Sequence, residues 1–422
     1  MKRRGKIAIA IAAAGTAVVA VVGAAALGLF EDSTSGGRNR LCATQPTGAS
    51  VPSPAPATRI VATGLCIPWG LAFLPDGTAL VTERDSARIL AVSADGRLSV
   101  VQEIADAFPR GESGLLGLAV SPNYGTDKLV YAYYTTRSDN RVVRFRLGEQ
   151  PQPVLAGIPL EERHDGGRIA FGPDGMLYVA VGDTDRRELA QDRGVLVGKI
   201  LRITPDGQPA PGNPFPDSPI WSLGHRNVQG LAWDSRGRLF ATEFGQDRID
   251  ELNLIEPGGN YGWPEVEGIG RDPRFVDPIA TWAPADASPS GLAIVNDQAY
   301  VACLRGRRLY RVDLSGGQGG QGGQGGGQGG QGEQRAQGGQ GEQRAQGGQG
   351  GGQGGPGKQR GQPTPTPMST LAPPVPLLAN EYGRLRTVAA GPDGALWILT
   401  SNRDPRGRPI STDDRLIRMP PP

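Results

Sequence analysis

Residues 70–84 read GLAFLPDGTALVTER and hold the pattern that decides the fold, two short apolar strands joined by a Pro-Asp-Gly turn. In such a turn proline presets φ at the first position, aspartate caps the backbone, and glycine supplies the positive φ that closes the hairpin. The same unit, with a third strand after the hairpin, recurs along the chain. Its copies open at Gly70, Gly117, Ile169, Gly230, Gly291 and Val388.

The spacing of these copies predicts an all-β, six-bladed propeller over residues 58–420. Successive copies lie roughly 50 to 60 residues apart once a low-complexity tract is left out, and units of several short strands at about this period are typical of propeller blades. One blade leaves a sheet face bare, so blades stack around an axis and cover one another. Two separate β-sandwiches would need a linker near the middle of the chain, and the sequence has none there.

Residues 315–376 form a low-complexity insertion within the fifth repeat. The tract is built from Gly-Gly-Gln and Gly-Glu-Gln-Arg-Ala units and continues into a proline-rich stretch. Such a composition buries little apolar surface, which predicts a disordered surface loop. Two roles stay open, a passive spacer and a docking segment for the cell wall or a partner.

The N-terminal residues 1–30 predict export. Four basic residues within positions 1–6 precede an uncharged apolar run over residues 7–30. A retained membrane anchor and a cleaved signal peptide both fit, and both place the remaining chain outside the cell, secreted or held on the outer face of the membrane. Residues 31–57, rich in Pro and Ser, read as a linker.

Charge and cysteine content exclude some classes of protein. The 44 Lys and Arg nearly balance the 42 Asp and Glu, so net charge gives no support for nucleic-acid binding. Cys42, Cys66 and Cys303 are too few for a disulfide scaffold and lack metal-type spacing. One pair and one free thiol are expected in an oxidising compartment, and the sequence leaves the pairing open.

Several polar residues precede the innermost strands, where propellers commonly place their sites. The two histidines are His164, in HDGGR, and His225, in GHRN. An imidazole is suited to general-base work because its pKa lies near neutrality. Repeated arginines in such loops would repel one another at the axis unless an anion lay among them. The candidate anion-site residues are Arg226, Arg305, Arg384 and Arg386, with Glu112, Asp183 and Asn227 in comparable loops.

At these residues the chain resembles the glucose/sorbosone dehydrogenase family, whose soluble aldose sugar dehydrogenases use pyrroloquinoline quinone (PQQ) and calcium. The resemblance covers roughly residues 60–419 apart from the insertion. Its most specific motifs are GESGLLG over residues 111–117, the His164 motif, GHRN over residues 224–227, and DELN (250–253) through NYGWP (260–264).

The resemblance implies oxidation of an aldose at C1 to the lactone, with His164 as general base and the hydride passed to PQQ. It implies an external electron acceptor as well. The three carboxylates of PQQ would be the anion that the arginines require. The positions implied to contact the cofactor are Glu112, Asp183, Arg226, Asn227, Leu304, Arg305, Gly306, Arg384, Leu385 and Arg386.

Two calcium ions are also implied by the resemblance. One would bind the backbone carbonyls of Gly245 and Gln246, and a second, structural ion would bind Glu251 and Tyr261. Three positions depart from the family pattern. Glu112 stands where some members have Gln, Gln246 where Pro is typical, and Arg305 where some members have Lys. Protonation of Glu112, or pairing with an arginine, would offset its charge beside the cofactor carboxylates.

Two rival functions differ in the residues they need. A non-catalytic binding propeller would keep the turns but would not need His164, Arg226 and Arg386 together. A calcium-dependent lactonase would need several acidic or amide side chains on one axial metal, whereas the axial loops here carry mainly Arg and His.

Overall fold

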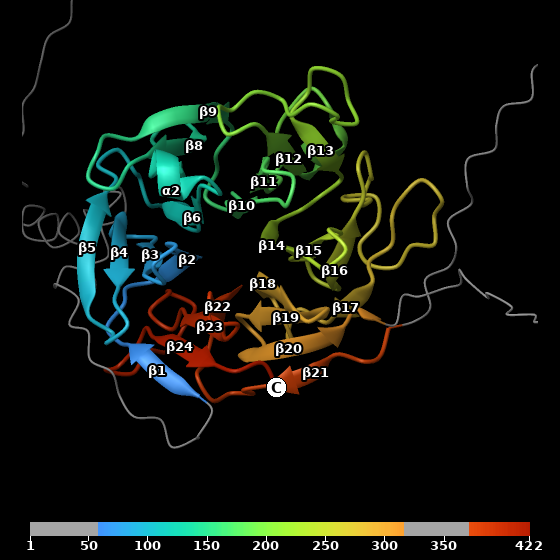
Figure 1. The fold of residues 1–422 in the computed structure, drawn as a ribbon. Coiled ribbons are helices and arrows are strands. Elements are labelled where there is room, and N and C mark those ends of the chain that lie inside the picture. The colour runs from blue at the N-terminus through green and yellow to red at the C-terminus, as the bar shows by residue number, and fades with distance from the viewer. Residues whose placement is uncertain (1–57, 316–370) are drawn as a thin grey trace, which may run out of the picture.

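The computed structural model describes residues 58–315 and 371–422, which form six four-stranded antiparallel sheets around a common axis (Figure 1). The predicted six-bladed propeller is therefore confirmed. Each of the six sequence copies opens in the innermost strand of one blade. The expected leader and linker, and most of the expected insertion, lie outside the described residues.

Strands follow one another from the axis outward in the first five blades. The first two blades comprise β2 (Pro68–Phe73), β3 (Ala79–Glu83), β4 (Arg88–Val92), β5 (Leu98–Glu103), β6 (Leu115–Val120), β7 (Val130–Thr135), β8 (Asn140–Phe145) and β9 (Gln152–Ile158). The next two comprise β10 (Ile169–Phe171), β11 (Leu177–Val181), β12 (Lys199–Ile203), β13 (Ile220–Leu223), β14 (Val228–Trp233), β15 (Leu239–Glu243), β16 (Asp250–Ile255) and β17 (Ala280–Trp282). The fifth comprises β18 (Pro289–Val295), β19 (Gln298–Cys303), β20 (Arg308–Asp313) and β21 (Val375–Leu377).

The sixth blade joins the two ends of the described chain. Its strands are β22 (Leu385–Ala390), β23 (Leu396–Thr400), β24 (Leu416–Met419) and, outermost, β1 (Arg59–Ala62). The N-terminal strand β1 pairs antiparallel with the C-terminal strand β24, which closes the ring (Figure 1).

The Pro-Asp-Gly turns adopt the predicted conformation. At the first of them Gly77 has φ 87°, and the Asp76 carboxylate accepts a hydrogen bond of 2.9 Å from the Thr78 amide. Gly175 and Gly394 also have positive φ, at 74° and 73°. The turn chemistry read from the sequence thus closes the hairpin between the first two strands of these blades.

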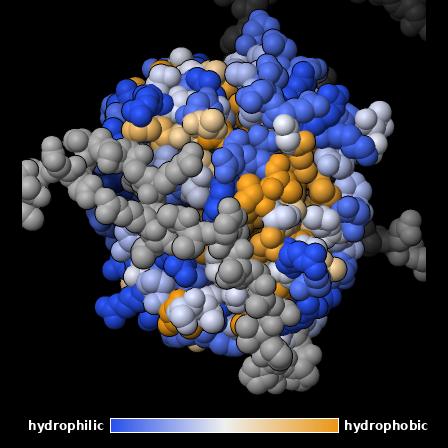
Figure 2. All heavy atoms as spheres, turned by 90° about the vertical axis from the view of Figure 1, so that its left-hand side faces the viewer, coloured by the Kyte–Doolittle hydropathy of each residue, from blue (hydrophilic) through white to orange (hydrophobic). Residues whose placement is uncertain are grey.

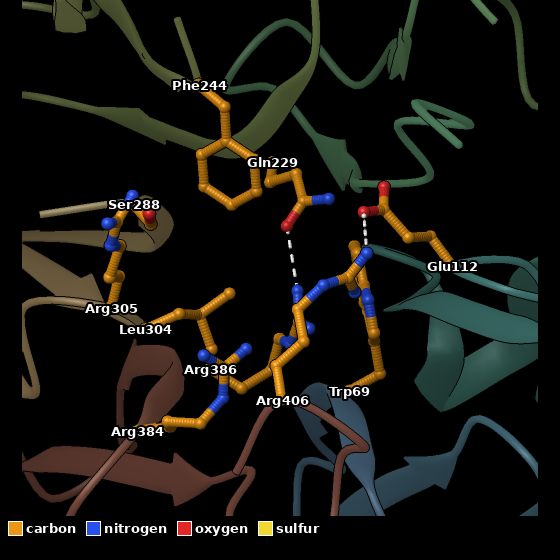
Figure 3. Close-up of a pocket in the computed structure, with 10 residues that line it drawn as sticks. All are labelled: Trp69, Glu112, Gln229, Phe244, Ser288, Leu304, Arg305, Arg384, Arg386 and Arg406. Carbon is orange, nitrogen blue, oxygen red and sulfur yellow. Dashed lines mark hydrogen bonds and ion pairs between the residues drawn. The ribbon is translucent and has the colours of Figure 1, made fainter. Parts of the chain in front are cut away.

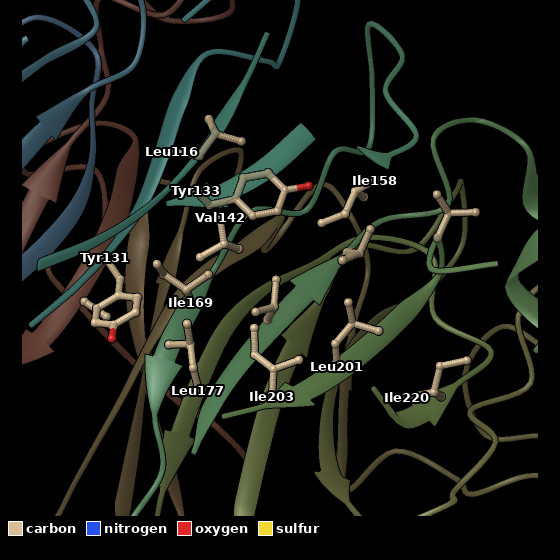
Figure 4. Packing of buried hydrophobic residues seen from close by; sticks show 14 of the residues in the cluster. Leu116, Tyr131, Tyr133, Val142, Ile158, Ile169, Leu177, Leu201, Ile203 and Ile220 are labelled. Atoms are coloured by element: carbon tan, nitrogen blue, oxygen red, sulfur yellow. The ribbon is translucent and has the colours of Figure 1, made fainter. Parts of the chain in front are cut away.

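Hydrophobic clusters fill the spaces between adjacent blades. One of them packs Leu116 and Tyr133 of the second blade against Ile169 and Leu201 of the third (Figure 4). Tyr131 also meets Phe171 edge to face, with ring centroids 5.0 Å apart. Because the core lies between sheets, each blade depends on its neighbours for burial.

The outer rim is more polar than these interfaces. The residues of β5 are exposed or half-buried throughout, and Val100 within it is 36% exposed. Figure 2 views the side of the molecule on which β5 lies, and where grey atoms do not cover it the surface is largely hydrophilic, with apolar residues in several places. Helical structure in the described residues is limited to α2 (Tyr124–Asp127) and the 3-10 helix η2 (Arg187–Gln191), and neither could cross a membrane.

Two details sharpen what the sequence left open. Cys66 is disulfide-bonded, whereas Cys303 is a free and fully buried thiol. The expected insertion ends too late in the sequence. Its last residues belong to β21 (Val375–Leu377), which pairs with β20 as the outermost strand of the fifth blade.

Candidate active site

A cavity of about 440 Å³ opens at the propeller axis. Its lining comes from loops and strand ends of several blades, so residues far apart in sequence face one space (Figure 3). The residues that line it are Trp69, Glu112, Gln229, Phe244, Ser288, Leu304, Arg305, Arg384, Arg386 and Arg406. Five sequence-predicted residues are among these ten: Glu112, Leu304, Arg305, Arg384 and Arg386.

Two of the predicted arginines are incompletely paired, of which Arg386 is buried and Arg384 half-buried. Arg386 is 5% exposed, and its Nη1 donates to Oε1 of Gln229 at 2.8 Å. The Nε atoms of Arg384 and Arg386 are buried without a hydrogen-bond partner. Burial lowers the pKa of Arg386 to about 9, and burial also lowers the pKa of Arg384. Because both guanidinium groups line the cavity with two further arginines and one carboxylate, the cavity favours an anionic ligand.

Asp404 is the acid closest to this arginine group. Its carboxylate accepts a hydrogen bond of 2.9 Å from Arg84 and lies 3.7 Å from Nη2 of Arg384. Burial alone would raise the pKa of Asp404, but the charges of Arg84 and Arg386 outweigh it and hold the value at about 2. Arg84 is also paired with Asp85 at 2.6 Å, so two carboxylates lie among these three arginines and a positive excess remains at the inner end of the cavity.

Arg168 adds a further buried cation behind the cavity. Its guanidinium lies over the Trp69 ring, 4.2 Å from the centroid, and donates to the backbone carbonyl of Gln229 at 2.7 Å. Burial, together with the charge of Arg386, lowers the pKa of Arg168 to about 9. Arg168 therefore adds positive charge against Trp69, one of the residues that line the cavity.

His164 is held by contacts at both ring nitrogens. Its Nδ1 lies 2.8 Å from Oδ1 of Asp183, and its Nε2 lies 2.9 Å from Nη2 of Arg226. A carboxylate only accepts and a guanidinium only donates, so the proton is assigned to Nδ1 and the lone pair to Nε2. Trp263 donates to the other Asp183 oxygen at 2.8 Å, which fixes the carboxylate in turn. The arrangement leaves Nε2 as the hydrogen-bond acceptor of the ring.

The backbone brings His164 to the edge of the cavity. Its amide donates to Oε2 of Glu112 at 3.1 Å, and Glu112 lines the cavity directly. The His164 side chain itself is 10% exposed and is not among the ten lining residues. The candidate base thus lies behind the residues that line the cavity, and its backbone contacts one of them, Glu112.

The predicted residues around Arg226 lie beside the cavity. Nη1 of Arg226 donates to the carbonyl of Phe244, a lining residue, at 3.2 Å. Asn227 is fully buried, and its Nδ2 has no partner. His225, the second histidine noted in the sequence, is also fully buried. Its Nε2 lies 2.8 Å from the Ser222 hydroxyl and its Nδ1 lies 2.9 Å from the Glu243 carboxylate, so it helps to position these two side chains.

Two cofactor positions implied by the resemblance do not present side chains to the cavity. Leu385 is fully buried in the core between the fifth and sixth blades. Gly306 is packed so closely that a Cβ there would lie 1.9 Å from the Asp286 carbonyl oxygen. At both positions only the backbone is available to a ligand.

The two implied calcium positions lie in and beside the loop after β15. Oε1 of Glu267 accepts the backbone amides of residues 246–249 and shapes this loop. Among the described residues, no hydrogen bond is donated to the carbonyl of Gly245 or Gln246. Both carbonyls are therefore available as oxygen ligands.

Glu251 and Tyr261 line a second, much smaller pocket together with Glu243 and Glu267. Burial and the charge of Glu243 raise the pKa of Glu251 to about 8. Oδ1 of Asn253 is buried without a partner, and Nδ2 of the same amide donates to Glu251 at 3.0 Å. These oxygens suit a hard cation. No group of three or more His, Cys, Asp or Glu side chains converges on a metal position in residues 58–315 and 371–422.

Sequence reasoning missed five lining residues. Trp69 and Gln229 stand directly before the glycines that open the first and fourth copies, so their place at the axis could have been read from the repeat. Arg406 lies in the loop before β24, which lacks the repeat pattern. Phe244 and Ser288 carry no motif of their own. The missed residues are Trp69, Gln229, Phe244, Ser288 and Arg406.

Comparison with known proteins decides the family. The sequence profile described as glucose/sorbosone dehydrogenase matches residues 65–324. This chain belongs to that family. An uncharacterized protein of Synechocystis is 34% identical over 338 residues, which cover 68% of this chain and 79% of that protein.

Two characterised relatives carry functional names. Quinoprotein glucose dehydrogenase B of Acinetobacter calcoaceticus is 32% identical over 259 residues. That match covers 52% of this chain and only 54% of the relative, so it spans about half of each. The solved structure of the PQQ-bound form of aldose sugar dehydrogenase from Streptomyces coelicolor is 45% identical with a TM-score of 0.71, and it covers 89% of this chain and 99% of that one.

Proposed function

We propose that this protein is an exported quinoprotein that oxidises an aldose at C1 to the lactone and passes the electrons to an external acceptor. The observation that carries the proposal is the axial cavity, whose lining holds four arginines and one carboxylate, with the His164 imidazole behind Glu112 and its Nε2 accepting a hydrogen bond from Arg226. The family membership and the two named relatives support the same chemistry.

The residues at the cavity fit PQQ. Arg384, Arg386 and Arg305 line the cavity and would hold its carboxylates. PQQ supplies a quinone that takes up a hydride from the sugar C1 carbon. The Trp69 ring contributes a flat apolar surface to the same cavity.

His164 would act as the general base. In the structure Arg226 donates a hydrogen bond to Nε2. The C1 hydroxyl of a bound sugar would replace Arg226 as the donor to Nε2 and transfer its proton to that nitrogen. Asp183, which accepts from Nδ1 at 2.8 Å, stabilises the imidazolium that results. Loss of the hydroxyl proton and of the C1 hydride together converts the aldose into its lactone.

Calcium would support the site from the loop after β15. The free carbonyls of Gly245 and Gln246 would bind one ion, whose charge would stabilise negative charge on a nearby oxygen. A second ion at Glu251 and the Tyr261 carbonyl would favour the ionised form of Glu251 and so lower its raised pKa. The Tyr261 hydroxyl is already engaged, because it donates to the Leu254 carbonyl at 2.6 Å.

The test is dye reduction by the purified protein loaded with PQQ and calcium chloride. We expect turnover with at least one aldose and none with His164→Ala, although that variant should still bind PQQ. Arg163→Ala is the matched control, because Arg163 precedes His164 but its side chain is 64% exposed. Full activity in His164→Ala, or no turnover by the folded wild type with any sugar of a broad panel, would refute the proposal.

A further inference from the structure

An ion pair joins two distant loops at the mouth of the cavity. Nη2 of Arg406, in the loop between β23 and β24, lies 3.0 Å from Oε1 of Glu112, in the loop before β6 (Figure 3). Both residues line the cavity. The side chain of Arg406 is 55% exposed and that of Glu112 is 22% exposed. The pair therefore lies toward solvent, whereas Arg386 lies at the buried end of the cavity.

Glu112 is also tied to the candidate base. Its second oxygen accepts the backbone amide of His164 at 3.1 Å, while its own amide donates to the Glu162 carbonyl at 2.9 Å. The Glu112 carboxylate is thereby held between Arg406 and the His164 backbone. It cannot swing into solvent without giving up one or both contacts.

The charge of Glu112 opposes the rest of the cavity. Among the ten lining residues Glu112 is the one acidic side chain, and four are arginines. A carboxylate fixed at this position repels an anionic ligand, and the repulsion acts over several ångströms in a partly buried space. Arg406 lies close enough to neutralise it.

We propose that Arg406 is a determinant of cofactor affinity and that it acts by masking the charge of Glu112. This inference rests on the proposed function, because the anion concerned is the PQQ tricarboxylate. Arg406 contributes in two ways. It adds a positive charge to the cavity lining, and it converts Glu112 from a repelling carboxylate into half of a neutral pair.

The two residues should therefore be coupled rather than independent. Arg406→Gln removes the cation and unmasks Glu112, so PQQ binding should weaken by roughly tenfold. Glu112→Gln removes the repelling charge and leaves Arg406 free to face the ligand, so binding should be at least as tight as in the wild type. In the double variant the repelling carboxylate is gone, and the dissociation constant should return to within about threefold of the wild type.

The experiment is an equilibrium titration of the full-length calcium-loaded protein with PQQ, followed by quenching of tryptophan fluorescence, for the wild type and these three variants. Arg408→Gln is the matched control, because Arg408 lies in the same loop, is exposed and does not line the cavity. It should bind PQQ like the wild type. Thermal unfolding of each variant verifies that the fold is retained.

Recovery of affinity in the double variant supports the inference. An unchanged dissociation constant in Arg406→Gln, or a double variant that binds no more tightly than Arg406→Gln, overturns it while leaving the proposed function in place. Failure of the folded wild type to bind PQQ overturns both.

Discussion

The conformation of His164 shows how one loop builds the candidate site. His164 has φ 57°, a region that non-glycine residues seldom adopt. Two contacts hold it there, because its amide donates to Glu112 and its carbonyl accepts the Thr184 amide at 3.3 Å. Gly167, in the same loop, has φ 95°, and a Cβ there would lie 2.6 Å from the Leu116 side chain. Gly167 of the HDGGR motif thus lets the loop pack closely against the second blade.

Asp183→Asn tests the assigned tautomer of His164. The amide can present a donor to Nδ1, which would move the proton to Nε2 and remove the lone pair that accepts the sugar proton. We expect turnover to fall by about a hundredfold or more. PQQ affinity should change by less than about threefold, because Asp183 does not line the cavity. Steady-state dye reduction and PQQ titration measure the two effects, and equal turnover in both proteins would contradict the assignment.

Asp165, next to His164, predicts a pH dependence of stability. Burial raises its pKa to about 6, even though Ser113 and Asn140 donate to its carboxylate. The folded state therefore binds this proton more tightly than the unfolded chain, and ionisation of Asp165 at neutral pH costs stability. Asp165→Asn keeps the shape, and its Oδ1 and Nδ2 can meet Asn140 and Ser113.

At pH 7.5 Asp165→Asn should therefore be more stable than the wild type by about 2–3 kcal/mol. The difference should shrink as the pH falls from about 6 to about 4, where the wild-type carboxyl takes up its proton in both states. Thermal or denaturant unfolding across this range checks the prediction. A gap that is constant with pH would show that Asp165 titrates normally in the folded state.

At the scale of a strand, small residues let the blades meet at the axis. Gly70, Gly117, Gly230 and Gly291 open four of the repeats, and a Cβ at each would come within 3 Å of atoms that include the backbone of the next blade. Register shifts interrupt the pairing of the same innermost strands, as between Pro68 and Leu71. Each of these four glycines therefore has a packing role as well as marking the start of its repeat.

Gly117→Ala should destabilise the fold. A Cβ at this position would lie 2.1 Å from the Gly167 carbonyl oxygen, so the second and third blades would have to separate. We expect a loss of about 2 kcal/mol or more in unfolding free energy, measured by denaturant titration. Gly125→Ala is the control, because it lies in α2 with nothing within 4 Å of its Cβ and should be neutral or slightly stabilising. The prediction fails if both variants unfold alike.

The repeat pattern could locate the inner strands but not the outer ones. Innermost and second strands such as β2 and β3 are buried and apolar, so they carry a strong signal around each turn. Outermost strands are short or exposed, as in β17 with three residues and β5 with no buried position. For the same reason the strand β21, at the end of the low-complexity tract, could not be told from that tract.

At the scale of the whole molecule, ring closure gathers the cations. Pairing of β1 with β24 joins the chain ends, and Arg84 of the first blade then meets Asp404 of the last, 320 positions apart. The sequence could predict that Arg226, Arg384 and Arg386 converge, because they lie just before or at the start of inner strands, whereas Arg305 reaches the cavity from the loop between β19 and β20. It could not predict which acid pairs with which arginine, or that Arg406 reaches the cavity, because those contacts depend on how two loops from different blades approach.

The central claim is that the axial arginines form a PQQ site, and calorimetric titration of the calcium-loaded protein with PQQ tests it most directly. We expect saturable binding with one PQQ per chain, weakened at least tenfold in Arg386→Gln and in Arg384→Gln while both variants stay folded. Binding that is equally tight in the wild type and both variants, or no binding by the folded wild type, would contradict it.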